Sequence, residues 1–371
     1  MALLASSCSG DEPAGDDSGA TPPPLVVPEI SDATLGAHWQ ELANPSAPTG
    51  SYVFDTPLGW FSLSTRSFGP DSKVLTAFES YLYRSVDGVN WHLVSLPQGG
   101  AATESVDDDL LLADMTYADG KLVVVGRLGG SNVLVSRDGE HFKSVFDGQQ
   151  TPLGFHTVTY AEDRFFALGQ SEAFTSLDGS SWERAKLGDA FLPNGVAYGN
   201  SLFVIAGNGG LALSPDARTW QRSKIDCAVP GACVPDPGGT LQQILLNVWF
   251  SEGRFYSGPV AAHRLSSSDG ITWEEAPAGP ISFARWGEYE VGYDSTDVVV
   301  WKPGSAPVHL DLESFPLDAR GAPINPGATG DAETTLIPPP VPETASFPLD
   351  SGQDCTTSPC IVLHGRLYIA Q

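Results

Sequence analysis

The chain has 371 residues and carries 45 acidic side chains against 19 lysines and arginines, a formal net charge of −26. This charge argues against nucleic acid as a partner, because phosphate binding needs clustered cations, and we interpret it mainly as a contribution to solubility. No run of 18 apolar residues occurs, so the sequence predicts no membrane-spanning helix.

The first residues resemble the end of a bacterial lipoprotein signal peptide. The segment 4–7 (Leu-Ala-Ser-Ser) leads from apolar to small residues and is followed by Cys8, with Ala5 standing where the family motif has leucine. The basic start and most of the apolar region of such a peptide are missing. The resemblance implies that Cys8 is lipidated and that the protein is extracytoplasmic, anchored to a bacterial membrane in the periplasm or at the cell surface. Residues 11–28 are acidic and proline-rich, which predicts a disordered tether.

One short motif recurs five times along the rest of the chain. A serine stands two residues before an aspartate, glycine or alanine follows the aspartate, and an aromatic residue comes four positions after it. Asp-Gly between apolar runs predicts a hairpin turn, in which the carboxylate accepts backbone N–H groups and the glycine takes a positive φ. We therefore expect the five aspartates to be structural: Asp87, Asp138, Asp178, Asp216 and Asp269.

A longer repeat surrounds each motif. An aromatic residue, such as Tyr160 or Tyr198, precedes a polar turn and an apolar run that ends in glycine, such as 165–169 or 203–207. Each unit thus predicts four short strands within about 40 residues, which is the size of a β-propeller blade.

The five motifs resemble the Asp-box, also called the sialidase or BNR repeat, which occurs on propeller blades. The usual family pattern is S-x-D-x-G-x-T-W, and this chain has a shortened variant with glycine directly after the aspartate. The resemblance implies that each motif joins the third and fourth strands of a blade. It does not extend to sialidase activity, because the F/Y-R-I-P stretch of those enzymes is absent and neither Tyr83-Arg84 nor Phe283-Ala284-Arg285 matches it.

The expected fold is an all-β, seven-bladed β-propeller formed by residues 29–371 as one domain. The first blade covers about 52–96, and the sixth has lost its motif at 303–307. The stretch Leu35-Gly36-Ala37-His38-Trp39 is interpreted as a degenerate motif, so that the N-terminus gives the outer two strands of the last blade and 362–371 the inner two. Sharing one blade between both ends leaves no exposed sheet edge. Six blades is the alternative, if the sixth unit is not a true blade.

The cysteines indicate an oxidising compartment. Cys227 lies close to Cys233, and Cys355 close to Cys360, which predicts two short disulfides. The alternative is that these four residues are free, buried thiols.

Three long connections between blades suggest where a ligand binds. They are 97–113, 226–244 and 311–360, and loops of this length are usually functional or disordered. We expect them to form one rim around the central channel. Candidate residues at this ligand face are three arginines that could clamp a carboxylate and two histidines that could act as acid–base groups: Arg127, Arg264 and Arg285, and His156 and His263.

An acidic group could bind a metal. Asp107, Asp108, Asp109 and Asp114 offer oxygen ligands of the kind that Ca²⁺ prefers, although their spacing differs from that of known calcium loops. The alternative is a solvated acidic loop, and no other cofactor is predicted.

The predicted function is a monomeric binding module for a glycan or a protein, since no complete catalytic motif is present. A glycoside hydrolase or lyase on the same face is an alternative and would need two facing carboxylates. A further alternative is an assembly or scaffolding factor for a membrane complex, by resemblance to the non-enzymatic Asp-box propellers that assist photosystem II assembly.

Overall fold

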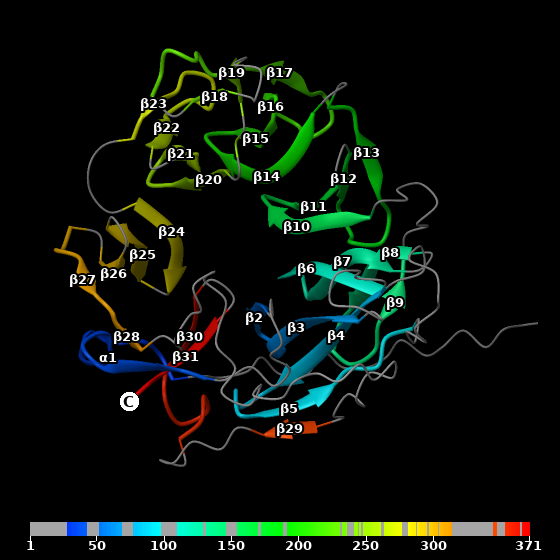
Figure 1. Cartoon of the computed structure of the whole chain (residues 1–371), viewed down its shortest axis with the longest axis vertical. Helices are drawn as coiled ribbons and strands as arrows, with labels where there is room; N and C mark the ends of the chain where they lie inside the picture. The colour runs from blue at the N-terminus through cyan, green and yellow to red at the C-terminus, as the bar shows by residue number, and fades with distance from the viewer. Residues whose placement is uncertain are drawn as a thin grey trace, which may run out of the picture.

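The structure is a computed structural model of the chain, and it describes residues 28–42, 52–68, 77–97, 110–128, 131–145, 154–169, 172–187, 191–230, 232–235, 241–243, 245, 248–260, 263–276, 281–286, 288–294, 297–302, 304–313, 344–346, 353–363 and 366–371. Seven sheets of four or five strands stand in a ring (Figure 1). The expected seven-bladed β-propeller is therefore confirmed, and the six-bladed alternative is wrong. In the described part of the chain, no helix is long and apolar enough to cross a membrane.

Six blades follow one another along the chain, each with its first strand nearest the centre of the ring (Figure 1). Blade 1 contains β2 (Tyr52–Thr56), β3 (Gly59–Phe68), β4 (Ala77–Ser85) and β5 (Asn90–Leu93). Blade 2 contains β6 (Leu110–Ala118), β7 (Lys121–Leu128), β8 (Ser131–Ser136) and β9 (Lys143–Ser144). Blade 3 contains β10 (Phe155–Ala161), β11 (Arg164–Gly169), β12 (Ala173–Ser176) and β13 (Glu183–Ala185).

The same order continues in the next three blades. Blade 4 contains β14 (Leu192–Gly199), β15 (Leu202–Asn208), β16 (Gly210–Ser214) and β17 (Gln221–Ser223). Blade 5 contains β20 (Val248–Ser251), β21 (Arg254–Val260), β22 (His263–Ser267) and β23 (Glu274–Glu275). Blade 6 contains β24 (Ile281–Trp286), β25 (Tyr289–Asp294), β26 (Asp297–Trp301) and β27 (Val308–His309).

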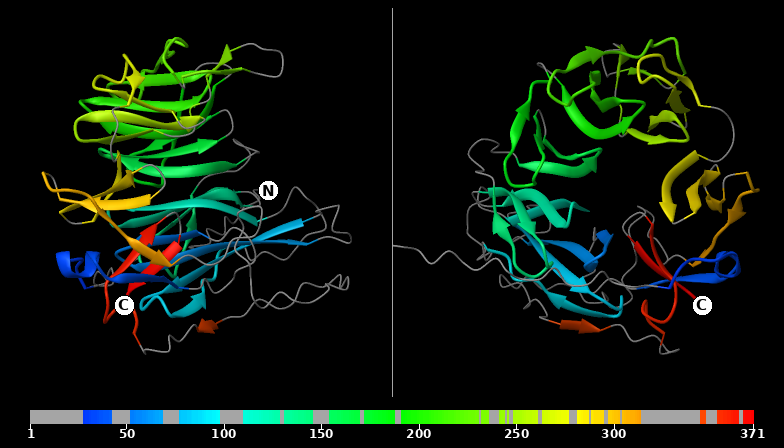
Figure 2. Two further views of the ribbon diagram at one scale, coloured as in Figure 1. Left: turned by 60° about the vertical axis from the view of Figure 1, so that its left-hand side comes forward. Right: turned by 180° about the vertical axis from the view of Figure 1, so that it is seen from behind.

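Both ends of the chain build blade 7, as predicted. Its sheet has the order β28 (Asp311–Glu313), β1 (His38–Glu41), β31 (Arg366–Ala370) and β30 (Cys360–Leu363). The two terminal segments lie side by side in the views of Figure 2, and the Gln371 N–H donates to the His38 carbonyl at 2.9 Å. The ring is closed by these pairings.

The N-terminal contribution to blade 7 differs from the prediction. The supposed degenerate motif is instead the helix α1 (Asp32–Leu35), because Ser31 and Thr34 form a capping box and Leu35 has no carboxylate to organise a turn. Trp39 then lies in the third strand, and the outermost strand is β28, which pairs with β1 in parallel. The N-terminus therefore supplies one strand of this blade, not two.

Two of the long connections contain strands of their own. The connection 226–244 holds a small hairpin of β18 (Val234–Pro235) and β19 (Leu241–Gln242). The connection 311–360 holds β28 and β29 (Thr344–Ser346), and β29 pairs with β5 as the fifth strand of blade 1. Both β28 and β29 cover outer sheet edges, which would otherwise be open to pairing with other chains.

The apolar core lies between neighbouring blades. Second strands are apolar on both faces, and residues 122–125 and 165–168 have no exposed surface. Phe166 of blade 3, for example, packs against Phe203 of blade 4 with ring centroids 5.4 Å apart. A strand buried on both faces loses the alternation of apolar and polar residues, which explains the continuous apolar runs in the sequence.

The five Ser-x-Asp turns share one hydrogen-bond pattern. In each, one carboxylate oxygen accepts the N–H groups two and three residues further on, and the serine hydroxyl donates to the same oxygen. In three turns the tryptophan Nε1 also donates to the glycine carbonyl, as from Trp91 to Gly88 at 3.1 Å. Ala217 takes the glycine position of the fourth turn with a φ of 56°, and Trp220 there has no partner for Nε1 among the described residues.

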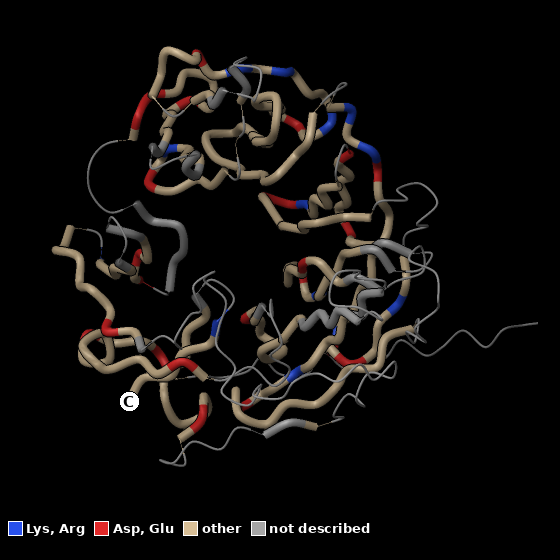
Figure 3. Tube along the Cα trace, viewed as in Figure 1, with Lys and Arg blue, Asp and Glu red and all other residues tan. Residues whose placement is uncertain are grey.

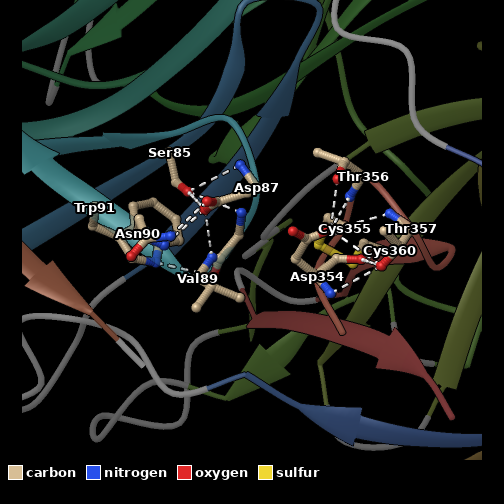
Figure 4. Close-up of a disulfide and its surroundings, with 11 residues drawn as sticks. Ser85, Asp87, Val89, Asn90, Trp91, Asp354, Cys355, Thr356, Thr357 and Cys360 are labelled. Carbon is tan, nitrogen blue, oxygen red and sulfur yellow. Dashed lines mark hydrogen bonds between the residues drawn. A yellow bond between two sulfur atoms is a disulfide. The ribbon is translucent and has the colours of Figure 1, made fainter. Parts of the chain in front are cut away.

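Both predicted disulfides, Cys227–Cys233 and Cys355–Cys360, are confirmed. The second lies beside the Ser-x-Asp turn of blade 1, and the Cys355 N–H donates to the Asp87 carbonyl at 2.9 Å (Figure 4). This disulfide thus holds the start of the last blade against the first one.

Candidate ligand-binding site

The inner strands of blades 2 to 5 surround a cavity of about 610 Å³. Its lining consists of Asp114 from β6, residues 157–162 of β10 and the following turn, 194–198 of β14, and 248–250 of β20. A volume of this order is typical of ligand sites in proteins. We take this cavity as the candidate site.

Aromatic side chains form much of the cavity wall. Tyr160, Tyr198 and Phe250 occupy equivalent positions in β10, β14 and β20, each opposite a phenylalanine of the second strand. The centroids of these three ring pairs are 4.8, 4.5 and 4.8 Å apart. Trp249 stacks on Tyr256 at 5.9 Å with an interplanar angle of 20°. The four lining rings are partly exposed and held from behind by other rings, so they present fixed faces to a ligand.

Asp114 connects two blades. One carboxylate oxygen accepts the Met115 N–H at 2.8 Å, and the other accepts the Val158 N–H at 2.9 Å and the Thr157 hydroxyl. Burial raises the pKa of this carboxyl, while the three hydrogen bonds act in the opposite direction. Its bonds therefore tie β6 of blade 2 to β10 of blade 3.

The predicted calcium site is not assembled in the described part of the chain. Asp107, Asp108 and Asp109 lie outside the described residues, and the carboxylate of Asp114 accepts protein donors. Among the described residues no group of three or more His, Cys, Asp or Glu side chains is arranged to hold a metal ion. Ca²⁺ binding stays a prediction.

Two further hydrogen bonds come from irregular positions in the inner strands. The strand register shifts around His156 in β10 and around Asn194 in β14, as it does around Ala113 in β6. Asn194 donates to the Leu245 carbonyl at 2.9 Å. Burial lowers the pKa of His156, whereas a hydrogen bond from its ring to the Pro193 carbonyl acts to raise it. A bulge can re-aim a side chain: His156 links blades 3 and 4, whereas Asn194 binds the connection that leads to blade 5.

The arginines and the second histidine predicted at the ligand face are not brought to one end of the ring. In an antiparallel blade, successive turns alternate between the two ends of the sheet. Arg127 near the end of β7, and His263 and Arg264 at the start of β22, adjoin second-to-third-strand connections. In the strand register Arg285 lies opposite Glu290, beside the first-to-second-strand turn of blade 6, which is at the opposite end of the ring. The backbone therefore does not bring the three arginines to one end of the ring, and the clamp stays a prediction.

The cavity is also displaced from the predicted face. Its lining reaches Glu162, in the turn between the first and second strands of blade 3. This end of each blade also carries the third-to-fourth-strand turns, where the Ser-x-Asp motifs lie, whereas the long connections enter the first strands at the other end. In the sequence, Tyr160 and Tyr198 served only to mark the start of each repeat. Their equivalent positions in successive inner strands could have indicated that aromatic rings line a common site.

Asp55 offers a test of the electrostatics near the axis. Asp55 has the position in β2 that Tyr160 has in β10. Burial raises the pKa of its carboxyl to about 6, although part of the residue is accessible to solvent. Because the unfolded value is about 3.9, the folded state binds this proton more tightly, and its contribution to stability is lost as the pH rises through about 6. We expect Asp55→Asn to raise the melting temperature at pH 7.5 and to leave it unchanged near pH 4. Equal shifts at both pH values, measured beside the exposed control Glu183→Gln, would contradict this explanation.

Comparisons with known proteins show no family for this chain. No family model matches the chain, and no curated protein matches it. Among solved structures, the chain is similar to a streptogramin B lyase, with 9% identity over 60% of this chain and 72% of that one and a TM-score of 0.42. It is similar to YCF48 from Cyanidioschyzon merolae, with 14% identity over 73% and 100% and a TM-score of 0.41. A structure of YCF48 bound to D1 peptide has 12% identity over 76% and 100% and a TM-score of 0.37. These similarities agree with the propeller fold, and we infer nothing else from them.

Proposed function

We propose that this protein is an extracytoplasmic binding module that receives a segment of a protein partner in the cavity of blades 2 to 5. The observation that carries the proposal is a preformed cavity with aromatic walls and polar groups between them, including Thr157, Asn194 and Glu162. The bond from Asp114 to blade 3 and the bond from Asn194 to the connection before blade 5 hold the cavity wall together before any ligand arrives. A preorganised site binds with a smaller entropy cost.

A polypeptide suits this cavity better than a glycan. In the described part of the chain, the inner strands β6, β10 and β14 each form the end of their sheet, and no described strand pairs with them towards the axis. Backbone groups along a sheet edge can bind an extended peptide. The small residues Gly195 and Ala197 in the lining leave room for a backbone to approach β14.

The cavity gives less support to the hydrolase alternative. Its carboxylates among the described residues are Asp114 and Glu162. Glycoside hydrolysis generally uses one carboxyl group as the acid and the other as base or nucleophile, but Asp114 accepts three hydrogen bonds, two of which tie blade 2 to blade 3. An assembly or scaffolding role is one form of the binding function, in which the partner belongs to a membrane complex.

The site is tested by filling it. Thr159 has the position in β10 that Trp249 has in β20, so Thr159→Trp places in blade 3 a side chain that blade 5 already accommodates. We expect this variant to lose at least about tenfold in affinity for peptides selected by the wild-type protein, since the ring occupies the space of the ligand. The exposed control Ser180→Trp should bind normally, and both should keep the wild-type melting temperature. Saturable binding to a glycan array, with no peptide selected, would contradict the proposal.

Anchoring of the module is proposed on the resemblance around Cys8, which lies outside the described residues. If Cys8 is lipidated, Cys8→Ser should move the protein from the membrane fraction to the soluble fraction of cells that express the chain behind a complete lipoprotein signal. The folded domain should be unaffected, so its melting temperature serves as the control. A variant that remains in the membrane fraction would show that Cys8 is not the anchor.

A further inference from the structure

The charges that line the cavity have one sign. Its charged lining residues are Asp114 and Glu162, and no lysine, arginine or histidine lines it among the described residues. The rest of the lining is aromatic, small, hydroxyl-bearing or amide-bearing. Within its described lining, the cavity therefore offers an incoming ligand the carboxylate of Glu162 and aromatic ring faces but no positive charge.

The turns at one end of the cavity add further carboxylates. Asp119, Glu162, Asp163 and Glu252 lie in the first-to-second-strand turns of blades 2, 3 and 5. Asp119 pairs with Lys121 at 2.6 Å, and Asp163 pairs with Arg164 at 3.1 Å. Figure 3 shows acidic positions in turns that face the centre of the ring.

The two glutamates, Glu162 and Glu252, differ from the two aspartates in their contacts. Neither Glu162 nor Glu252 has an ion-pair or hydrogen-bond partner for its side chain among the described residues, and both are exposed. Both adopt a positive φ, 58° and 49°, a region that favours glycine and asparagine. Turn formation therefore does not call for glutamate at either place, and within the described part of the chain both carboxylates are available to a ligand.

The negative field reaches the aromatic walls. The pKa of Tyr160 is raised by burial and then by the charges of Asp119, Asp163 and Glu162. The pKa of Tyr256, which stacks with Trp249, is raised by burial and then by the charge of Glu252, while the charge of Arg254 acts in the opposite direction. Electron-rich ring faces attract cations as well, and this chain already places the guanidinium of Arg222 4.0 Å from the centroid of Phe191.

We infer that the cavity selects a cationic polypeptide segment, whose lysine or arginine side chains lie over the aromatic walls and point to Glu162 and Glu252. The inference rests on the proposed binding function and adds the chemistry of its ligand. The formal charge of −26 would also steer a basic partner towards the protein. Glu162 in the cavity lining and Glu252 in the neighbouring turn disfavour acidic segments, because a like charge would be brought close to them.

Selection from a library of random dodecapeptides, displayed without bias in charge, tests the inference. We expect lysine and arginine to be enriched at least about threefold among the bound peptides over the starting library. Bound peptides without this enrichment would overturn the cationic inference and leave the binding proposal standing. A library in which no peptide binds above background would overturn both.

Variants that remove the two negative charges then test where the selected peptide binds. For a selected basic peptide, Glu162→Gln combined with Glu252→Gln should lower the affinity about fivefold or more at low salt, and the loss should shrink as salt is raised. Glu183→Gln is the matched control, because Glu183 is an exposed glutamate on the outermost strand of the same blade as Glu162. Basic peptides that bind the double variant as tightly as the wild type would overturn the inference, because their site would lie elsewhere.

Discussion

Replacing Gly88 with alanine is expected to lower the free energy of unfolding by about 3 kcal/mol. Gly88 has a φ of 76°, a region in which an L-residue costs about 1–2 kcal/mol. An added Cβ would also lie 2.6 Å from the Cys355 sulfur and 3.1 Å from a methyl group of Leu367. Because that sulfur is bonded to Cys360, it cannot move aside as the end of a flexible side chain would.

A matched control separates the two costs. Gly120 has a φ of 69°, and nothing lies within 4 Å of the position where its Cβ would be. Gly120→Ala should therefore lose only about 1 kcal/mol, from the backbone alone. Both free energies can be measured by urea unfolding with the disulfides intact. Equal losses in the two variants would show that the contact between Gly88 and the disulfide does not contribute to stability.

The close approach at Gly88 is part of a pattern that links each turn to the preceding blade. A Cβ on Gly139 would lie 2.7 Å from the Phe61 ring of blade 1, and one on Gly270 would lie 2.8 Å from Leu202 of blade 4. At Gly88 the preceding blade is blade 7, which both chain ends build. The turn glycines thus serve packing between blades as well as the turn itself, and at Gly88 this packing closes the ring.

The repeat made most of the ring predictable, because each blade is a local meander whose four strands follow one another in the sequence. The exceptions are elements fixed by distant contacts. β28 and β29 have three residues each and lie in an acidic, proline-rich connection, so no periodic pattern marks them. Their pairing with β1 and β5 depends on where the closed ring places those edges. The helix α1 replaced an expected turn for a local reason, the capping pair of Ser31 and Thr34.

The candidate site was harder to predict than the fold. Loop length pointed to the end of the ring where the long connections enter, whereas the described cavity is built from inner strands. The bonds of Asp114 and His156 to the next blade, and that of Asn194 to the connection before blade 5, depend on shifts of strand register, and a sequence pattern does not place these shifts. The repeated aromatic position of Tyr160 and Tyr198 was visible in the sequence. That these rings line one cavity became evident only from the arrangement of neighbouring blades.

Removing the carboxylate of Asp178 is expected to lower the free energy of unfolding by about 2 kcal/mol. One of its oxygens accepts the N–H groups of Ser180 and Ser181 at 2.8 and 2.7 Å and the Ser176 hydroxyl at 3.1 Å. Asp178→Ala leaves these donors to water, and urea unfolding at pH 7 would measure the loss. Asp178→Asn is the matched control, because its amide oxygen can still accept, and it should lose less.

The pH dependence of this loss distinguishes a hydrogen-bonded carboxylate from a simple packing effect. The N–H of Ser181 and the other donors hold the pKa of Asp178 below its ordinary value. The folded pKa thus lies below the unfolded value of about 3.9, so the contribution is present above about pH 4 and is lost as the pH falls through the folded pKa. The difference between wild type and Asp178→Ala should therefore shrink on acidification. Because the turn lies at the periphery, affinity for a selected peptide should not change, and a loss of affinity at unchanged stability would give Asp178 a place in the binding site instead.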